Sequence, residues 1–273
     1  ALTPDFVLNY SILDLGSPLG VPGRLGGLTF LAGDTNTLLI GGEANVAEGA
    51  IYRVPVIRDV DGHIIGMGEG TRYADAPYND GGISYGPDGV LFASQWPVNQ
   101  LSQYKPGSTS PDKVIDLTPL GVEGSHSAIN FVPAGYPGAG RVKLTTYIGG
   151  QWLDAGLAPD GFGTFDLVSV TAVATSRLPG GPEGFAYVPF GSPVVGGTPT
   201  MLLSEFAAGA VTAYDLDING DPIVASRRVF IEGLSGAEGA VIDPVTGDFL
   251  FSTFGGGDRV LAIRGFNVPV PGS

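Results

Sequence analysis

The feature that most constrains this chain is a motif that recurs along it. Residues 181–189 read Gly-Pro-Glu-Gly-Phe-Ala-Tyr-Val-Pro, and residues 236–244 read Gly-Ala-Glu-Gly-Ala-Val-Ile-Asp-Pro. Each copy places an acid and a glycine before a short apolar run. A turn and a second apolar run follow, at 201–206 in one copy and 249–254 in the other. Such repeats are typical of chains that use one supersecondary unit several times.

Three weaker copies precede this pair, so the repeat covers most of the chain. The first apolar residues of the five units lie 46 to 56 residues apart, at Leu28, Ile83, Ile129, Phe185 and Ala240. That spacing is close to the roughly 40–50 residues of a four-stranded propeller blade, with some longer loops. The sequence therefore predicts an all-β fold, a five-bladed β-propeller. Six blades are the alternative if the long third unit hides two.

The two ends of the chain are expected to meet. The last unit has only three predicted strands, because no strand follows residues 260–263. Residues 6–15 form a predicted strand that belongs to no unit, and residues 13–20 echo residues 115–121, which end the second unit. We therefore expect the N-terminal strand to complete the last blade and to remove the exposed sheet edges.

The predicted boundaries follow from the same reading. One propeller domain is expected over 1–266 and a Pro-rich tail over 267–273. In the third unit, the outer strands are expected near 163–168 and 170–176.

Composition supports this fold class and narrows the partners. The chain has 45 Gly and 22 Pro but only 15% charged residues, which is typical of short strands joined by tight turns. The formal net charge is −14, and the 13 Lys and Arg are scattered, with no run longer than two, which argues against nucleic acid and anionic membrane surfaces as partners. The chain has no Cys, which excludes thiolate metal sites, and no apolar run of membrane-span length.

Two sets of residues are expected at one mouth of the central channel, because the innermost strand of a blade begins at the face where the second strand ends. The first set precedes the innermost strands and comprises Asp80, His126, Glu183 and Glu238. The second set follows the second strands and comprises Glu43, Gln95, Trp96, Tyr147, Glu205, Phe206 and Phe254.

The glutamates of these sets, Glu43, Glu183, Glu205 and Glu238, are the candidate metal ligands. Carboxylates near one axis repel one another and are costly to desolvate, and a bound cation relieves both effects. Oxygen ligands without Cys favour Ca²⁺, with Mg²⁺ and Mn²⁺ as alternatives. An equally good interpretation makes the glutamates acceptors for backbone N–H groups of neighbouring blades.

The remaining candidates divide into proton carriers and binding residues. His126 and Asp80 are the candidate catalytic residues, although His126 also fits a hydrogen-bonded core position. One amide and four aromatic residues are the candidate substrate-binding residues, namely Gln95, Trp96, Tyr147, Phe206 and Phe254. His63 follows a hairpin turn and is given no role. Residues 215–221 resemble the opening of a calcium loop, but its twelfth position falls on Ser226, so a hairpin turn is favoured.

Two stretches resemble known families. The run Gly-Pro-Asp-Gly-Val-Leu-Phe-Ala at 86–93 and the Glu-Gly pair at 183–184 resemble blade signatures of secreted propellers of the gluconolactonase-like and NHL-like families. The chain end at 266–273 resembles the linker before the Pro-Glu-Pro sorting tail of exosortase-processed bacterial proteins, with Val270 in place of Glu. The resemblance implies a protein secreted or held at the bacterial cell surface.

Two classes of function follow as expectations. The first is a metal-dependent enzyme of the lactonase, esterase or lyase type, acting on a small molecule at the channel mouth. The alternative is a non-enzymatic extracellular protein that binds a glycan or another protein, or serves in a matrix. A monomer is favoured in either case.

Overall fold

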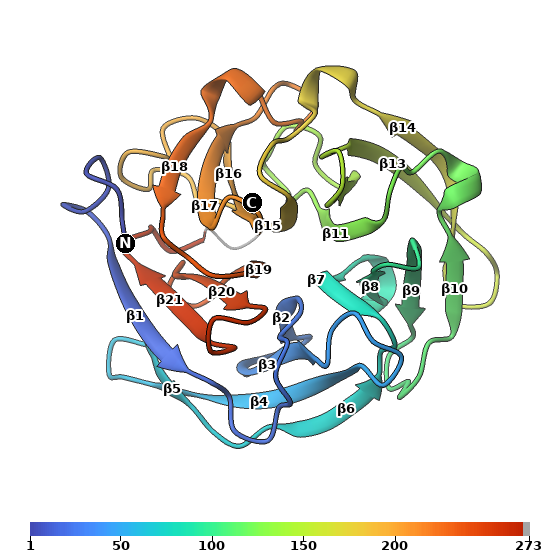
Figure 1. Cartoon of the computed structure of the whole chain (residues 1–273), viewed down its shortest axis with the longest axis horizontal. Coiled ribbons are helices and arrows are strands. Elements are labelled where there is room, and N and C mark those ends of the chain that lie inside the picture. The colour runs from blue at the N-terminus through green and yellow to red at the C-terminus, as the bar shows by residue number, and fades with distance from the viewer. Residues whose placement is uncertain (270–273) are drawn as a thin grey trace.

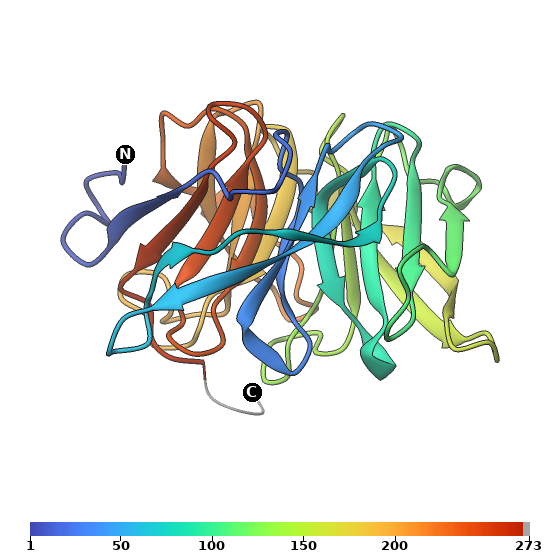
Figure 2. The same ribbon diagram turned by 90° about the horizontal axis from the view of Figure 1, so that it is seen from below.

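Each copy of the repeat folds into an antiparallel sheet, and the five sheets stand as blades around one axis (Figure 1). The computed structural model describes residues 1–269. The innermost strands of the blades are β2, β7, β11, β15 and β19. Seen from the side, the ring is a thick disc, and its strands run obliquely between the two faces (Figure 2). The predicted five-bladed propeller is confirmed, and the six-bladed alternative is not.

The strand bounds follow the repeat. The first blade contains β2 (Leu28–Leu31), β3 (Asp34–Gly42), β4 (Ala50–Arg58), β5 (Ile64–Met67) and β6 (Thr71–Asp75). The second contains β7 (Asn79–Tyr85), β8 (Leu91–Gln95), β9 (Gln100–Tyr104) and β10 (Lys113–Asp116). The third contains β11 (His126–Phe131), β12 (Val142–Thr146), β13 (Trp152–Pro159) and β14 (Phe165–Ala172).

The last two blades complete the ring. The fourth contains β15 (Pro182–Tyr187), β16 (Thr200–Glu205), β17 (Ala210–Asp215) and β18 (Arg228–Ile231). The fifth contains β19 (Ala237–Ile242), β20 (Phe249–Thr253), β21 (Val260–Arg264) and β1 (Ser11–Gly16). The helices described are single 3₁₀ turns: η1 (Pro87–Gly89), η2 (Thr118–Leu120), η3 (Ala174–Ser176) and η4 (Val224–Ser226).

The N-terminal strand closes the ring, as predicted. β1 pairs antiparallel with β21, with Ser11 opposite Arg264 and Asp14 opposite Leu261. The strand is shorter than the predicted 6–15, because residues 3–10 form hydrogen-bonded turns in which Tyr10 N donates to Phe6 O. Phe6 and Tyr10 are therefore four residues apart on one face. Both pack edge-on against Phe230, at centroid distances of 4.7 and 5.0 Å.

Two details of the blades differ from the prediction. In the third blade, one continuous strand, β14, spans the gap between the predicted segments 163–168 and 170–176, the strand before it is β13, and residues 174–176 form the turn η3. The reversal of the chain lies between β13 and β14. There Asp160 Oδ1 accepts hydrogen bonds from Phe162 N and Thr164 N, and Gly161 has a φ of +82°. In the first blade, β6 was not predicted and pairs with β4 beside β5.

The glycines of the repeated motif let the innermost strands approach one another. A Cβ on Gly184 would lie 2.6 Å from Ala240 N, and one on Gly82 would lie 2.4 Å from Ile129 N. Side chains do not fit at these contacts, so backbone closes the axis directly. Glu183, directly before Gly184, and Asp80, two residues before Gly82, therefore lie at the mouth, beside the part of the channel that the backbone closes.

The chain leaves the last blade along the fourth. Asn267 N donates to Ser192 Oγ at 3.0 Å, and Asn267 Nδ2 donates to Phe190 O at 3.3 Å. Residues 270–273, which include most of the predicted tail and Val270, lie outside the described residues. Within residues 1–269, the helices are too short to cross a membrane.

Candidate functional site

One cavity gathers most of the residues expected at the channel mouth. Its volume is about 170 Å³, and its lining combines three acids, four aromatic residues and one amide: Asp80, Glu183, Glu238, Trp96, Tyr147, Phe206, Phe254 and Asn45. The acids belong to the starts of β7, β15 and β19. The aromatic residues directly follow β8, β12, β16 and β20. The expected meeting of two strand ends therefore holds for seven of these eight residues.

The axial triad, Asp80, Glu183 and Glu238, forms the floor of the cavity. Each side chain offers one oxygen, and these oxygens all lie within 4.8 Å of one another. The residues are only 1%, 4% and 1% exposed. One buried oxygen of each has no hydrogen-bond partner among residues 1–269: Asp80 Oδ2, Glu183 Oε2 and Glu238 Oε1. Because buried polar atoms are normally paired, three neighbouring buried acids with one unpaired oxygen each are a candidate place for a ligand.

Burial and mutual repulsion dominate the electrostatics of the triad. Burial raises the pKa of Asp80 to about 8, against the hydrogen bonds from Glu238, Asn45 and the Gly81 backbone, which lower it. Burial also raises the pKa of Glu183 well above its usual range, and the charge of Asp80 adds to the effect. The pKa of Glu238 is raised by burial and by the charges of both neighbours. Without a cation, the cluster therefore retains protons near neutral pH.

Asn45 is the lining residue that the sequence did not reveal. It lies in the loop after β3 with a φ of +68°, a left-handed conformation that Asn tolerates better than most residues. With its amide turned so that nitrogen faces the triad, it donates to Asp80 Oδ1 at 2.9 Å and to Asn79 O at 3.2 Å. The available signal was position, since Asn45 follows the second strand of the first blade as Trp96 follows that of the second.

The four aromatic residues form a collar above the floor. Trp96 and Tyr147 meet edge to face at a centroid distance of 6.4 Å, Tyr147 and Phe206 at 5.8 Å, and Phe206 and Phe254 at 6.0 Å. The aromatic collar therefore runs unbroken across the second to fifth blades, and Asn45 stands in the first. The indole Nε1 of Trp96 is buried and has no partner among residues 1–269.

Two of the four predicted metal ligands lie outside the triad. Glu205 is fully buried, and Arg227 neutralises it: Arg227 Nη2 lies 2.5 Å from Glu205 Oε2, and Tyr214 OH donates to Glu205 Oε1 at 2.6 Å. Glu43 lines a separate hollow together with Arg24 and Asp258. The structure thus joins Glu183 and Glu238 to Asp80, which the sequence offered as a proton carrier.

His126 and Gln95 do not reach the cavity lining. His126 is 0% exposed, with Nε2 at 2.9 Å from Ala128 O and Nδ1 at 3.4 Å from Gln100 O. Burial lowers its pKa to about 4, so the ring is neutral at neutral pH. Gln95 Nε2 donates to Pro77 O at 2.6 Å. The core interpretation of His126 fits this geometry, and the catalytic one has no support from it.

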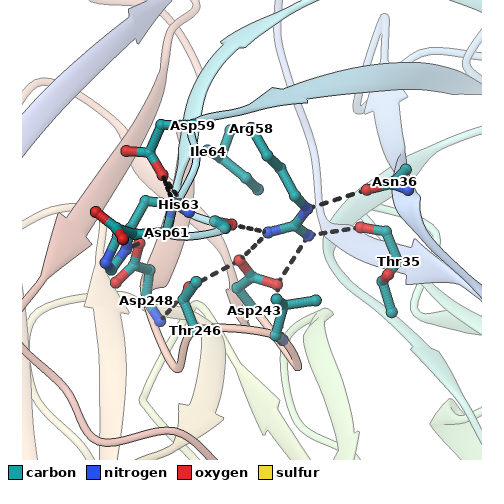
Figure 3. A network of polar contacts seen from close by, with 12 residues as sticks. Thr35, Asn36, Arg58, Asp59, Asp61, His63, Ile64, Asp243, Thr246 and Asp248 are labelled. Atoms are coloured by element: carbon teal, nitrogen blue, oxygen red, sulfur yellow. Dashed lines mark hydrogen bonds and ion pairs between the residues drawn. The ribbon is translucent and has the colours of Figure 1, made fainter.

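A second buried cluster of charges joins the first blade to the fifth (Figure 3). This interblade cluster contains Arg58, His63, Asp243 and Asp248. Arg58 binds both oxygens of Asp243, at 2.6 and 3.0 Å, and donates to the carbonyls of Gly62 and Thr35. His63 Nδ1 lies 2.6 Å from Asp248 Oδ2. His63, to which the sequence assigned no role, thus helps to hold the ring closed.

The segment that resembles a calcium loop is a hairpin turn. Asp217 Oδ1 accepts hydrogen bonds from Asn219 N at 2.8 Å and Asp221 N at 3.0 Å, and Gly220 has a φ of +78°. Asp221 Oδ1 is taken by Lys143 Nζ at 2.6 Å and by Trp152 Nε1 at 2.9 Å. These oxygens are occupied by protein donors, which favours a structural role.

Comparison with known proteins gives the fold but no family. No protein-family model and no curated protein sequence matches the chain. Among solved structures, a candidate gluconolactonase is 15% identical, with 100% of this chain and 87% of that one covered and a TM-score of 0.51. A glucose dehydrogenase is 13% identical over 92% of this chain and 98% of that one, with a TM-score of 0.51.

A third similar structure is an auxiliary nutrient binding protein from Bacteroides thetaiotaomicron. It is 12% identical, the match covers 93% of this chain and 76% of that one, and the TM-score is 0.50. At these identities the likeness shows a shared propeller architecture. The chemistry of the cavity must therefore be argued from its own residues.

Proposed function

We propose that this chain binds a divalent cation at the axial triad and uses the ion to hold a small molecule in the cavity above it. The observation that carries the proposal is the set of three orphaned carboxylate oxygens, one from each of Asp80, Glu183 and Glu238. Ca²⁺ binds oxygen at 2.3–2.6 Å, so two of its ligands are at most about 5 Å apart. The separations within the triad, 4.8 Å or less, meet this condition.

The donor set favours a hard cation with open positions. All three side chains offer oxygen, which suits Ca²⁺, Mg²⁺ or Mn²⁺. Ca²⁺ takes six to eight oxygen ligands, so three from the floor leave positions for water or a ligand on the cavity side. The net charge of −14 also attracts cations to the protein.

A structural alternative keeps the triad as a proton-sharing cluster. Protons held between the three carboxyls would also relieve their repulsion, as the raised pKa of Asp80 allows. This alternative predicts no bound ion and no response of stability to chelator.

The proposal is tested by calorimetric titration of Ca²⁺ into chelator-treated protein, together with melting curves. We expect one Ca²⁺ site. At a free Ca²⁺ concentration of 100 times the dissociation constant, the ion should stabilise the folded protein by about 2.7 kcal/mol, which raises Tm by several degrees. The double variant Glu183→Gln, Glu238→Gln should lose both. Glu43→Gln is the matched control, because Glu43 lies in a different hollow, and should retain both. Equal melting curves with and without Ca²⁺, on protein shown to be metal-free, would favour the proton-sharing alternative.

Hydrolysis of a lactone or ester is a second candidate function, and one observation favours it. Asp80, with a pKa of about 8, could carry a proton beside an ion held by Glu183 and Glu238. Such an ion polarises a carbonyl or a water molecule. A screen of lactones and aryl esters with Ca²⁺-loaded protein tests this, and Asp80→Asn should abolish any turnover found. Without turnover, the cation-dependent binding function stands alone.

The setting of this function is also a proposal. We place the protein outside the cell or on its surface, where a nutrient-like small molecule or a glycan would reach the cavity. The auxiliary nutrient binding protein of similar architecture supports a binding role on such a fold.

A further inference from the structure

The cavity wall contains one hydrogen-bond donor that the protein leaves unmatched. Trp96 lines the cavity, and its indole N–H is buried without a partner among residues 1–269. The other tryptophan shows how the fold treats a structural indole, because Trp152 Nε1 donates to Asp221 Oδ1 at 2.9 Å. A buried donor without an acceptor is unfavourable, so a ligand that brings an acceptor gains more here than at an exposed position.

The walls around this donor suit a flat ring. Four aromatic side chains surround the cavity in successive edge-to-face contacts, at centroid distances of 5.8 to 6.4 Å. Aromatic rings add favourable edge-to-face or offset contacts with a further ring. The volume, about 170 Å³, is close to that of an apolar cavity of about 150 Å³ that holds one benzene molecule.

The polar groups of the wall are too few for a sugar ring. With the triad oxygens on an ion, the wall donors that remain for a ligand are the Trp96 N–H and the Tyr147 hydroxyl, because Asp80 Oδ1 and Asn79 O accept the two hydrogen bonds of the Asn45 amide. A hexose would bury more hydroxyl groups than these can match, and each unmatched group opposes binding. A ring with two adjacent oxygens needs only the ion and one donor.

We infer that the ligand of this site is an aromatic ring with two adjacent oxygen atoms, of the catechol type. Its oxygens bind the ion, the Trp96 N–H donates to one of them, and its ring packs against the aromatic collar. This inference rests on the proposed function, because the ion must be bound before it can be chelated. It adds a ligand class and makes Trp96 the residue that determines specificity.

The test uses the full chain loaded with Ca²⁺ and three six-membered rings as probes in calorimetric titrations. Catechol has adjacent oxygens on an aromatic ring, hydroquinone has the same atoms with the oxygens opposite, and myo-inositol has adjacent oxygens without an aromatic face. We expect catechol to bind at least tenfold more tightly than either control. Equal affinity for hydroquinone, or equal or higher affinity for myo-inositol, would overturn the inference.

Two substitutions locate the effect. Trp96→Phe keeps a ring and removes the N–H, so catechol affinity should fall roughly tenfold while Ca²⁺ affinity stays the same. Phe206→Leu removes one aromatic wall and should narrow the preference for catechol over myo-inositol. Trp152→Phe, the same change at the other tryptophan, should leave the catechol affinity of the folded protein unchanged.

The outcomes separate this inference from the proposed function. Failure of the Ca²⁺ titration itself would remove the proposed function before any ring is added. Normal Ca²⁺ binding with unchanged catechol affinity in Trp96→Phe would remove the inference alone. Catechol binding of undiminished strength in the Glu183→Gln, Glu238→Gln protein would also overturn it, because the ring would then not need the ion.

Discussion

The axial triad and the interblade cluster are both buried groups of acids, and they differ in what the protein gives them. Asp243, 0% exposed, receives both contacts of a guanidinium from Arg58, which arrives from the neighbouring blade. Glu183 and Glu238 receive no cationic side chain from any blade among residues 1–269. Desolvation of the carboxylates is unfavourable in both clusters, but only in the interblade cluster does a cationic side chain of the protein compensate it.

This difference separates structural acids from candidate binding acids. Glu205 belongs with Asp243, since Arg227 and two hydroxyl groups occupy its oxygens. A buried acid that its own fold has neutralised contributes to ring closure. A group of buried acids that the fold has left open is better explained by something that binds from outside.

Removing the Arg58 guanidinium from the interblade cluster should cause the largest loss of stability. Arg58→Met keeps much of the apolar stem but leaves Asp243 as a buried charge without its partner. We expect the free energy of unfolding to fall by about 3–5 kcal/mol, measured by urea denaturation at pH 7.

The exposed pair Arg72–Asp75, with side chains 51% and 60% exposed, gives a matched control. Arg72→Met should change stability by less than about 1 kcal/mol. A comparably small loss for Arg58→Met would show that Asp243 does not depend on its guanidinium, and the contrast between the two clusters would disappear.

His126 extends the comparison to a buried base without an acidic partner. Its pKa is lowered from 6.5 to about 4, so the unfolded chain takes up a proton between these values before the folded chain does. Its contribution to stability is therefore complete above pH 6.5 and is lost as the pH falls through 4. The difference corresponds to about 3 kcal/mol.

The measurement is a double difference, because the carboxyl groups of the protein also titrate in this range. The stability of the wild type relative to His126→Gln should fall by about 3 kcal/mol from pH 7 to pH 4. A constant difference across this range would mean that His126 has the same pKa in the folded and the unfolded chain, so that burial does not hold its ring neutral.

The architecture could be predicted from the sequence because the repeated motif contains residues that the packing of the innermost strands requires. A glycine after each acid is required where innermost strands touch, as at Gly184 and Ala240, so the motif marks the axis. The shorter first strand and the continuous β14 were not predicted, because turns held by Tyr10 and Asp160 override alternating apolar patterns.

The candidate site was predicted in part, and the limit lies in partners that are distant along the chain. Glu183 and Glu205 were both predicted to be metal ligands at the channel mouth, yet Arg227 forms an ion pair with Glu205. His126 precedes an inner strand, as Glu183 and Glu238 do, but its ring bonds to backbone carbonyls. Position within the repeat gives the face on which a residue lies, whereas its charge partners depend on which blade packs beside it.

The smallest expected change in stability comes from a substitution in the axial triad, and its sign is opposite to that of Arg58→Met. Glu183→Gln preserves shape and replaces an orphaned oxygen with an amide that can donate to a neighbouring carboxylate. In metal-free protein at pH 7, the free energy of unfolding should stay unchanged or rise by about 1 kcal/mol, because repulsion within the triad falls. Urea denaturation in EDTA measures this. A loss above about 2 kcal/mol would show that the Glu183 carboxylate makes a structural bond, and would place the triad with Asp243 among the acids that the fold has already satisfied.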